Sequence, residues 1–277
     1  MRKLKLPMGD EIPVLGQGTW QMGEAAKDRA AEVKALQFGI DTGMTLIDTA
    51  EMYGNGGAEE VTGEAIKGRR DAVFLVTKVL PSNAGHKQTV AACERSLQRL
   101  KVDTVDLYLL HWRGNVPLSE TLAGFQDLAK AGKIRSFGVS NFDMGDMVEW
   151  SALGGAEATQ TNQVLYNVGA RGIDFDLLPW CSAKGVTIMA YSPLAQASFR
   201  KSLGLERVAR RHNATVAQIM LAWCLRHPTV FAIPKSSHPE RVKENAKAAE
   251  IQLSADDIAD IDRDFPAPKK ASSLAMA

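Results

Sequence analysis

The chain has 277 residues, of which 45% are hydrophobic and 23% charged, as in ordinary soluble globular proteins. Its formal net charge of +1 offers neither the basic surface that nucleic acid requires nor an acidic tail. No stretch approaches the ~18 uninterrupted apolar residues of a membrane span, and the basic start of the chain lacks the apolar core of a signal peptide. We therefore expect a cytoplasmic protein without nucleic-acid or membrane partners.

The three cysteines, Cys93, Cys181 and Cys224, lie far apart and form no C-x-x-C pair. An odd, scattered set is typical of reduced thiols in a reducing compartment. Because free cysteines are commonly buried, we expect all three to pack in the protein interior.

The chain begins with a predicted hairpin over residues 3–13, KLKLPMGDEIP, with its turn at Met8, Gly9 and Asp10. Beyond the hairpin, short apolar runs recur, and each ends in polar or glycine residues. Their mean spacing is about 31 residues, which is the size of a strand–helix–strand unit. The runs begin at residues 14, 46, 73, 105, 134, 158, 186 and 230.

Helical periodicity fills the gaps between these runs. Residues 30–40 place their apolar side chains mostly on one stripe. Residues 118–132, LSETLAGFQDLAKAG, show the same period between an N-cap signal at Ser119 and a stop signal at Gly132. Helices therefore alternate with the predicted strands.

The longest interval, before the last apolar run, holds two helical patterns at residues 203–212 and 215–226. The tail after Phe265 has neither period and should lie as an irregular segment over the surface. Eight strand–helix units in ~250 residues favour an α/β fold of the (β/α)₈ TIM-barrel type over an open sheet. We expect a single domain over residues 1–277, with the hairpin capping the lower end of the barrel.

Three patterns resemble functional motifs, but each lacks the spacing or the residue that the motif requires. The glycines of residues 16–23, GQGTWQMG, are too widely spaced for a Rossmann dinucleotide motif. Ser140 in GVSNF lacks the closing glycine of a nucleophile elbow. No metal site is expected, because no ligand spacing links the histidines, which are His86, His111, His212, His227 and His238.

Four chemically active side chains fall at one end of the predicted barrel. Asp48, Lys78 and His111 end three consecutive strands, and Tyr53 lies in the loop after Asp48. Singly, each residue also fits a structural role: a loop cap, an exposed rim charge, a strand-end side chain and a loop anchor. Active sites of such barrels lie at the carboxyl ends of the strands, so the coincidence of four favours a catalytic site.

These groups suit proton donation to a carbonyl oxygen. A free tyrosine has a pKa near ~10, and a nearby lysine ammonium should lower the pKa of Tyr53. A lowering of about two units requires roughly 3 kcal/mol of differential stabilisation. Asp48 should keep Lys78 charged in a dry pocket, and His111 should orient the substrate oxygen.

The four residues resemble the catalytic tetrad of the aldo-keto reductases. Other segments resemble the family in order and spacing along nearly the whole chain: GQGTW, LIDTAEMYG, VTK, LLHW, GVSNF, NQVLYN, YSPLA and IPKSS followed by R..EN. The closest resemblance is to short bacterial members similar to methylglyoxal reductases. It implies an NADPH-dependent enzyme that reduces aldehydes and α-dicarbonyls to alcohols by hydride transfer, with Tyr53 as general acid.

The resemblance also implies where the cofactor lies. Ser140, Asn141 and Gln163 would hold the nicotinamide carboxamide, and Tyr191 would stack on the ring. Lys235 and other residues after the last strand would hold the adenosine end, where two cations and a hydroxyl near a helix start suit a 2′-phosphate. The full set assigned to the cofactor is Gly18, Thr19, Trp20, Asp48, Ser140, Asn141, Gln163, Tyr191, Ser192, Pro193, Leu194, Ala195, Lys235, Ser236, Ser237, Arg241, Glu244 and Asn245.

The substrate pocket implied by the resemblance is walled by Trp20 and Trp112 beside Tyr53 and His111, although bare aromatics also fit a core role. The chain departs from the family pattern in three places. YGNGGAEEVTG is longer and richer in glycine, which predicts a looser pocket mouth. HWRGN lacks a common proline, and Leu165 stands where many members have glutamate.

Two other functions are compatible with parts of the sequence. An NADPH-binding regulatory subunit is one alternative, like the potassium-channel β subunits, which resemble this family and keep the tetrad. A barrel lyase or hydrolase could use the segment after the last strand for a substrate phosphate. The leading hypothesis is a monomeric carbonyl reductase whose partner is a small-molecule carbonyl substrate.

Overall fold

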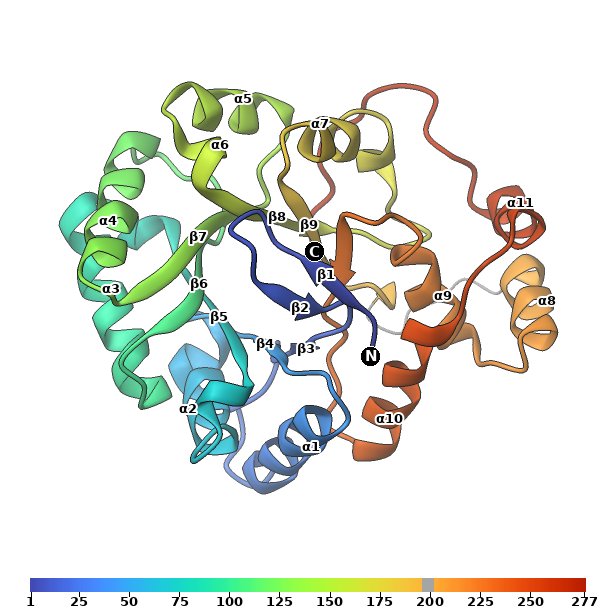
Figure 1. Ribbon diagram of the computed structural model, residues 1–277, viewed down its shortest axis with the longest axis horizontal. Helices are drawn as coiled ribbons and strands as arrows, with labels where there is room; N and C mark the ends of the chain where they lie inside the picture. Colours follow the sequence, from blue (N-terminus) through green and yellow to red (C-terminus); the bar gives the residue numbers. More distant parts are fainter. Residues whose placement is uncertain (196–201) are drawn as a thin grey trace.

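The computed structural model describes residues 1–195 and 202–277, and within them eight parallel strands curl into a barrel surrounded by helices (Figure 1). Each strand of the barrel lies beside its neighbour in sequence, from β3 to β10. Parallel bridges of Leu15 with Ala232 and of Gly18 with Lys235 join the first strand region to the last. These bridges close the sheet, and the expected (β/α)₈ barrel is confirmed.

The barrel strands are short, and each ends close to the residue that the apolar runs indicate. They are β3 (Gln17–Gly18), β4 (Leu46–Asp48), β5 (Phe74–Val79), β6 (Val105–Leu110), β7 (Ile134–Ser140), β8 (Thr159–Leu165), β9 (Thr187–Tyr191) and β10 (Val230–Ala232).

Helices follow the strands and cover the outside of the barrel. They are α1 (Arg29–Asp41), α2 (Gly57–Ala65), α3 (His86–Leu100), α4 (Leu118–Lys130), α5 (Met144–Ala152), α6 (Gly155–Ala158), α7 (Leu177–Ala183), α8 (Leu203–Arg211), α9 (Val216–Cys224), α10 (Pro239–Lys247) and α11 (Ala255–Asp264). Helices α8 and α11 pack together at one side of the ring (Figure 1).

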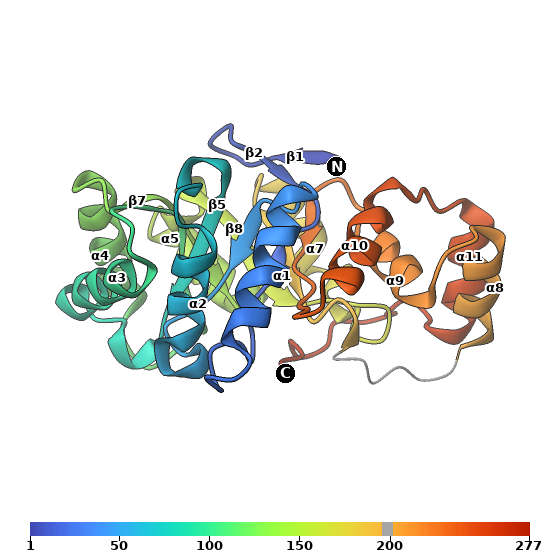
Figure 2. The same cartoon turned by 90° about the horizontal axis from the view of Figure 1, so that it is seen from below.

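A two-stranded hairpin covers one end of the barrel. It consists of β1 (Lys3–Lys5) and β2 (Glu11–Pro13), as the sequence predicts, and the backbone N–H of Met8 in its turn donates to Oε1 of Gln160 at 2.9 Å. Figure 2 shows the hairpin at one end and the C-terminus at the other. Because the hairpin closes the amino-terminal end, chemistry is left to the end where the parallel strands finish.

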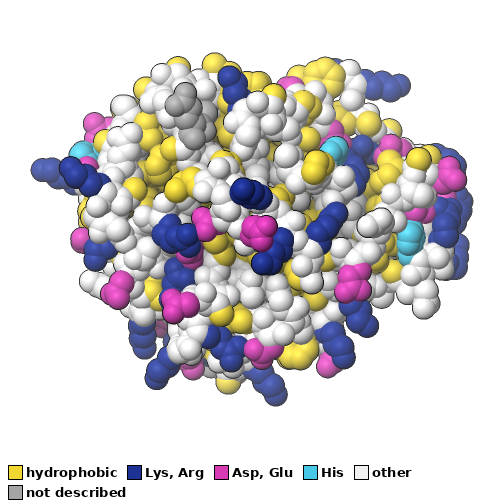
Figure 3. All heavy atoms as spheres, viewed as in Figure 1, with side chains coloured by type: hydrophobic (Ala, Val, Ile, Leu, Met, Phe, Trp, Pro, Cys, Tyr) yellow, Lys and Arg dark blue, Asp and Glu magenta, His cyan; other side chains and the backbone are white. Residues whose placement is uncertain are grey.

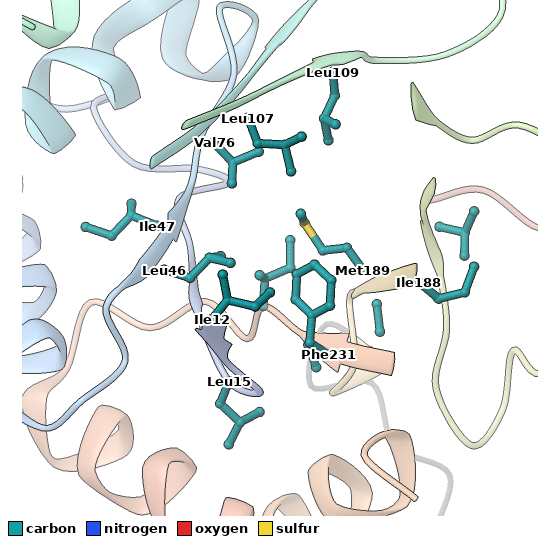
Figure 4. Close-up of a cluster of buried hydrophobic side chains, with 14 of the residues drawn as sticks. Ile12, Leu15, Leu46, Ile47, Val76, Leu107, Leu109, Ile188, Met189 and Phe231 are labelled. Carbon is teal, nitrogen blue, oxygen red and sulfur yellow. The ribbon is translucent and has the colours of Figure 1, made fainter. Parts of the chain in front are cut away.

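Apolar side chains fill the barrel between its strands. Leu46, Val76, Leu107, Met189 and Phe231 come from five different strands and converge inside it (Figure 4). All are fully buried, as expected for parallel strands that are covered on both faces. This packing fixes the strand ends that carry the polar side chains.

The cysteines lie in the interior, as expected. Cys93, Cys181 and Cys224 are buried free thiols, and burial raises the pKa of each to about 12. They are therefore protonated, unreactive packing residues at neutral pH.

The helix boundaries confirm most of the sequence predictions. The two patterns before the last strand form α8 and α9, and Gly132, at a φ of +70°, follows the end of α4. Ser119 is not the N-cap: α4 already begins at Leu118, after Pro117, so Ser119 lies within the first turn. A proline at the helix boundary has a fixed φ that suits helix entry, and it replaced the predicted cap.

The surface matches the balanced composition. On the hairpin face, Lys and Arg side chains are interspersed with Asp and Glu (Figure 3). No helix within the described ranges is long and apolar enough to cross a membrane.

Candidate active site

Asp48, Lys78, His111 and Tyr53 meet at the open end of the barrel. Asp48 is the last residue of β4, Lys78 is the fifth residue of β5, and His111 directly follows β6. Tyr53 begins a short turn, Tyr53–Gly56, after β4. All four side chains are buried, so the structure brings together the four residues that the strand ends indicated.

The ammonium of Lys78 is the centre of the cluster. Its Nζ donates to Oδ2 of Asp48 at 2.7 Å, to the Thr49 carbonyl oxygen at 2.8 Å and to the Tyr53 hydroxyl at 3.2 Å. An ammonium has three N–H donors, and these three acceptors match them. Lys78 is therefore held in one position between a carboxylate and a phenol.

The pKa of Tyr53 is shifted in the opposite direction from the one expected from the sequence. It is raised above the ordinary tyrosine value, because burial of the phenol outweighs the charge of Lys78. The expectation of a lowered pKa was wrong. Burial alone would lower the pKa of Lys78, but Asp48 and Tyr53 hold it above its ordinary value. At neutral pH the pair is a protonated phenol and a charged ammonium.

His111 is a neutral imidazole. Burial and the nearby Lys78 charge lower its pKa to about 2. Its ring lies 5.6 Å from the Tyr53 ring, and its buried Nδ1 has no hydrogen-bond partner among the described residues. A neutral imidazole can donate one hydrogen bond toward a substrate oxygen without transferring a charge.

Two tryptophans stand beside the cluster at the barrel mouth. The ring centroids of Trp20 and Tyr53 lie 5.0 Å apart in a T-shaped contact, and those of Trp112 and His111 also lie 5.0 Å apart. Trp20 is 43% exposed, which is unusual for a large aromatic side chain. Their positions fit the predicted walls of a substrate pocket.

The residues expected at the nicotinamide are linked by hydrogen bonds. Ser140 Oγ donates to the Gln163 carbonyl oxygen at 2.9 Å, and the Tyr191 hydroxyl donates to Oδ1 of Asn141 at 3.0 Å. Asn141 Nδ2 donates to the His111 carbonyl oxygen at 3.1 Å. Gln163 lies in the same patch, but its side-chain Nε2 donates to Asp48 at 2.7 Å.

The loop after β9 is held by a residue that the sequence argument did not single out. Asn167 Nδ2 donates to the Ser192 carbonyl oxygen at 3.0 Å, and its Oδ1 accepts from the backbone N–H groups of Gly169 and Ala170. Ser192 and Ala195 both have left-handed φ values of +47°. A buried polar residue just after a strand end was the available signal for Asn167.

The residues expected at the adenosine end of the cofactor differ in whether their side chains are free to bind a ligand. Lys235 and Arg241 have no ion-pair partner among the described residues, and Arg241 lies in the first turn of α10. Glu244 accepts a hydrogen bond from Thr215, the N-cap of the neighbouring helix α9, and Asn245 is buried. Lys235 and Arg241 are thus free to meet a ligand, whereas Glu244 is already hydrogen-bonded within the fold and Asn245 is buried.

Other expected residues lie at the end of β3, in the loop after it and in the loop after β10. A Cβ at Gly18 would lie 2.8 Å from the Ile233 carbonyl oxygen, so only glycine fits there. The Thr19 hydroxyl is buried and donates to the Asp48 carbonyl oxygen at 3.0 Å, which fixes the end of β4. Ser236 Oγ accepts from the His238 N–H at 3.1 Å, and Ser237 follows Ser236 in the same turn.

A family model described as the aldo/keto reductase family matches residues 14–263. The chain belongs to the aldo/keto reductase family. The match spans the barrel from the first strand region to α11 and includes every member of the tetrad. The resemblance read from the sequence motifs is confirmed.

Individual relatives agree along nearly the whole chain. Methylglyoxal reductase YeaE of Escherichia coli (strain K12) is 50% identical over 96% of this chain and 95% of its own. Glyoxal reductase of Bacillus subtilis is 37% identical over 94% of this chain and 91% of its own. A solved aldo/keto reductase from Klebsiella pneumoniae, in complex with NADP and acetate, is 48% identical, with a TM-score of 0.96 and 99% of each chain covered.

The glycine-rich departure from the aldo/keto reductase pattern forms a tight turn and not a loose loop. Gly54, Asn55 and Gly56 all have left-handed φ values, and α2 begins at Gly57. The backbone of Gly57 lies against that of Gly23 so closely that a side chain at either residue would overlap the other chain segment. The expectation of a looser mouth is therefore wrong, because the glycines allow close packing of the Trp20 loop on α2.

The other two departures lie near the mouth. Arg113, in the segment that lacks the common proline, pairs with Glu149 through a contact of 3.1 Å. Leu165 lines a hollow beside the C-terminal segment, residues 272–275. Within the described residues, no group of three or more His, Cys, Asp or Glu side chains is placed to hold a metal ion.

Proposed function

We propose that this chain is an NADPH-dependent reductase of small aldehydes and α-dicarbonyls, with Tyr53 as the proton donor. The main support comes from Lys78 at the open end of the barrel. It donates hydrogen bonds to Asp48, at 2.7 Å, and to Tyr53, at 3.2 Å. The similarity to a methylglyoxal reductase and a glyoxal reductase supports the substrate class. The Klebsiella pneumoniae structure in complex with NADP supports the cofactor, as does a second one from the same organism, 48% identical and in complex with NADPH.

The rim of the barrel fits an extended dinucleotide. Ser140, Asn141 and Tyr191 present polar and aromatic groups on one patch, which suits a flat carboxamide-bearing ring. Lys235 and Arg241 flank the start of α10, where backbone N–H groups and side-chain cations favour a phosphate. Bound NADPH would supply the hydride for the carbonyl carbon.

The protein side of the reaction is a proton delivery to the carbonyl oxygen. The raised pKa keeps the Tyr53 hydroxyl protonated at neutral pH, and its O–H donates the proton. The ammonium of Lys78 stabilises the phenolate that remains. His111, neutral because burial lowers its pKa to about 2, orients the oxygen by a hydrogen bond.

The mouth favours small uncharged carbonyls. Trp20 packs on Tyr53 and Trp112 packs on His111, so both can give the pocket aromatic walls. The cation nearest in sequence to Trp112, Arg113, is already paired with Glu149. A charged substrate would gain no free counter-charge from Arg113, whereas an α-dicarbonyl needs none.

The same proposal includes a single domain over residues 1–277, a monomer and a cytoplasmic location. The free buried thiols of Cys93, Cys181 and Cys224 support a reducing compartment. The continuous ring of neighbouring strands supports one domain.

The purified protein should oxidise NADPH when methylglyoxal is added, and more slowly or not at all with NADH. Absorbance loss of NADPH is measured against a panel of methylglyoxal, benzaldehydes and sugar aldehydes. A protein that binds NADPH but turns over no carbonyl in the panel would contradict the proposal and favour the regulatory-subunit alternative. Turnover of a carbonyl by the wild type would support the reductase over that alternative.

Arg241→Ala should weaken NADPH binding at least tenfold and leave NADH binding nearly unchanged, because only NADPH carries the 2′-phosphate. Fluorescence titration with both cofactors measures the difference. Lys243→Ala is the matched control, since Lys243 is exposed on the same helix two residues further along. Equal losses for the two cofactors would remove Arg241 from the 2′-phosphate site.

A further inference from the structure

We propose that Gln163 is a positioning residue for the catalytic tetrad: its side-chain amide fixes the Asp48 carboxylate and thereby aims Lys78 at Tyr53. This role is separate from any contact that Gln163 makes with a cofactor. The inference rests on the proposed function of the tetrad.

The two residues face each other across the barrel. Asp48 ends β4, and Gln163 lies in β8, four strands away in the ring. Gln163 Nε2 donates to Oδ1 of Asp48 at 2.7 Å, while Lys78 takes the other oxygen, Oδ2, also at 2.7 Å. Each of the two side chains is only 2% exposed, so water does not replace this bond.

The bond removes the rotational freedom of the carboxylate. A carboxylate held at one oxygen can turn about its Cβ–Cγ bond, but one held at both oxygens cannot. Of the three bonds made by Lys78 Nζ, the one to Tyr53 is the longest, at 3.2 Å. A shift of Asp48 that moves the ammonium would therefore affect the contact with Tyr53 first.

The orientation of the amide follows from its partner. An ionised carboxylate accepts hydrogen bonds and cannot donate them, so the NH₂ group of Gln163 faces Asp48. The Oε1 atom, which has no partner among the described residues, remains available for a donor on a ligand. One side chain can thus contact a bound cofactor with its oxygen and the tetrad with its nitrogen.

The backbone of Gln163 is held independently of its side chain. Its carbonyl oxygen accepts from Ser140 Oγ at 2.9 Å and from the Asn141 N–H at 2.8 Å. Burial raises the pKa of Asp48, and the Lys78 charge and the Gln163 hydrogen bond oppose this rise. The amide therefore also helps to keep Asp48 ionised opposite Lys78.

Two substitutions at Gln163 separate positioning from cofactor contact. Gln163→Met keeps the length of the side chain but removes the donor, so kcat at saturating NADPH should fall by about 10- to 100-fold, the loss typical of a misplaced catalytic group. Gln163→Glu can donate to Asp48 only while one proton is shared by the two carboxyls. Its kcat relative to wild type should fall as the pH rises, and Gln163→Met should show no such recovery at low pH.

Gln160→Met is the matched control. Gln160 is a buried amide in the same strand, but it contacts Met8 in the hairpin at the other end of the barrel. It should keep wild-type kcat even if stability falls. A loss of kcat in Gln160→Met equal to that in Gln163→Met would overturn the proposal.

Other outcomes are equally decisive. Weaker NADPH binding by Gln163→Met with unchanged kcat would make Gln163 a cofactor contact only, and a pH-independent ratio for Gln163→Glu would contradict positioning. If the wild type is active and Tyr53→Phe is not, these failures concern Gln163 alone. A wild type without carbonyl turnover would instead overturn the proposed function.

A measurement without cofactor tests the bond itself. The side-chain NH₂ resonance of Gln163, identified by its loss in Gln163→Met, should exchange slowly with solvent and should shift in Asp48→Asn. Rapid exchange, or an unchanged resonance in Asp48→Asn, would overturn the proposal whatever the activity of the protein.

Discussion

Tyr53→Phe should lose most carbonyl reduction while it folds and binds NADPH like the wild type. Phenylalanine keeps the ring contacts with Trp20 and His111, at 5.0 and 5.6 Å, and lacks only the hydroxyl 3.2 Å from Lys78. A positioned general acid contributes about 10²- to 10⁴-fold, so kcat should fall by that factor. NADPH oxidation with methylglyoxal measures kcat, and a fluorescence titration measures cofactor binding.

Tyr108→Phe is the control for this experiment. Tyr108 lies in β6, its ring packs on Phe125, and its buried hydroxyl has no hydrogen-bond partner among the described residues. Removing an unsatisfied hydroxyl costs little, so this variant should keep full turnover. Near wild-type turnover in Tyr53→Phe would contradict the role of Tyr53 as proton donor. Equal losses of turnover in both variants would show that turnover responds to any change of a buried phenol.

The position of the site was predictable because strand ends can be read from local sequence. An apolar run that stops at a polar residue marks the carboxyl end of a buried strand, and Asp48, Lys78 and His111 each stand at such a point. In a parallel barrel consecutive strands are neighbours, so three local signals define one shared location. Tyr53 could be assigned to the same location because the loop that carries it after β4 is short.

The protonation of the site was not predictable from residue types. Lys78 beside Tyr53 suggested a lowered pKa, but the sign depends on how completely the phenol is buried. Burial arises from groups supplied by several strands and by the Trp20 loop, and no single segment reveals their sum. The neutral state of His111 has the same cause.

Contacts across the barrel could not be predicted from the local sequence either. The bond between Asp48 and Gln163 joins residues 115 positions apart, on strands that are not neighbours. The glycine-rich turn suggested looseness, because glycine permits many backbone conformations. Only the position of Gly23 against Gly57 shows that the glycines serve close packing instead.

Lys78→Met should cost both stability and turnover, and the two losses should have different causes. Methionine fills the space of the lysine stem but leaves Asp48 as a buried carboxylate without its counter-charge. Breaking a buried ion pair in this way costs about 3–5 kcal/mol, which urea unfolding measures. Without the ammonium at 3.2 Å, Tyr53 has nothing to stabilise its phenolate, so kcat should fall by at least about 10²-fold.

The double variant Lys78→Met/Asp48→Asn separates these effects. With the carboxylate replaced by a neutral amide, the buried charge is gone, and much of the lost free energy of unfolding should return. Turnover should stay low, because the ammonium is still missing from Tyr53. Recovery of turnover together with stability would show that Lys78 acts only through the fold, and it would remove the lysine from the proton-delivery mechanism.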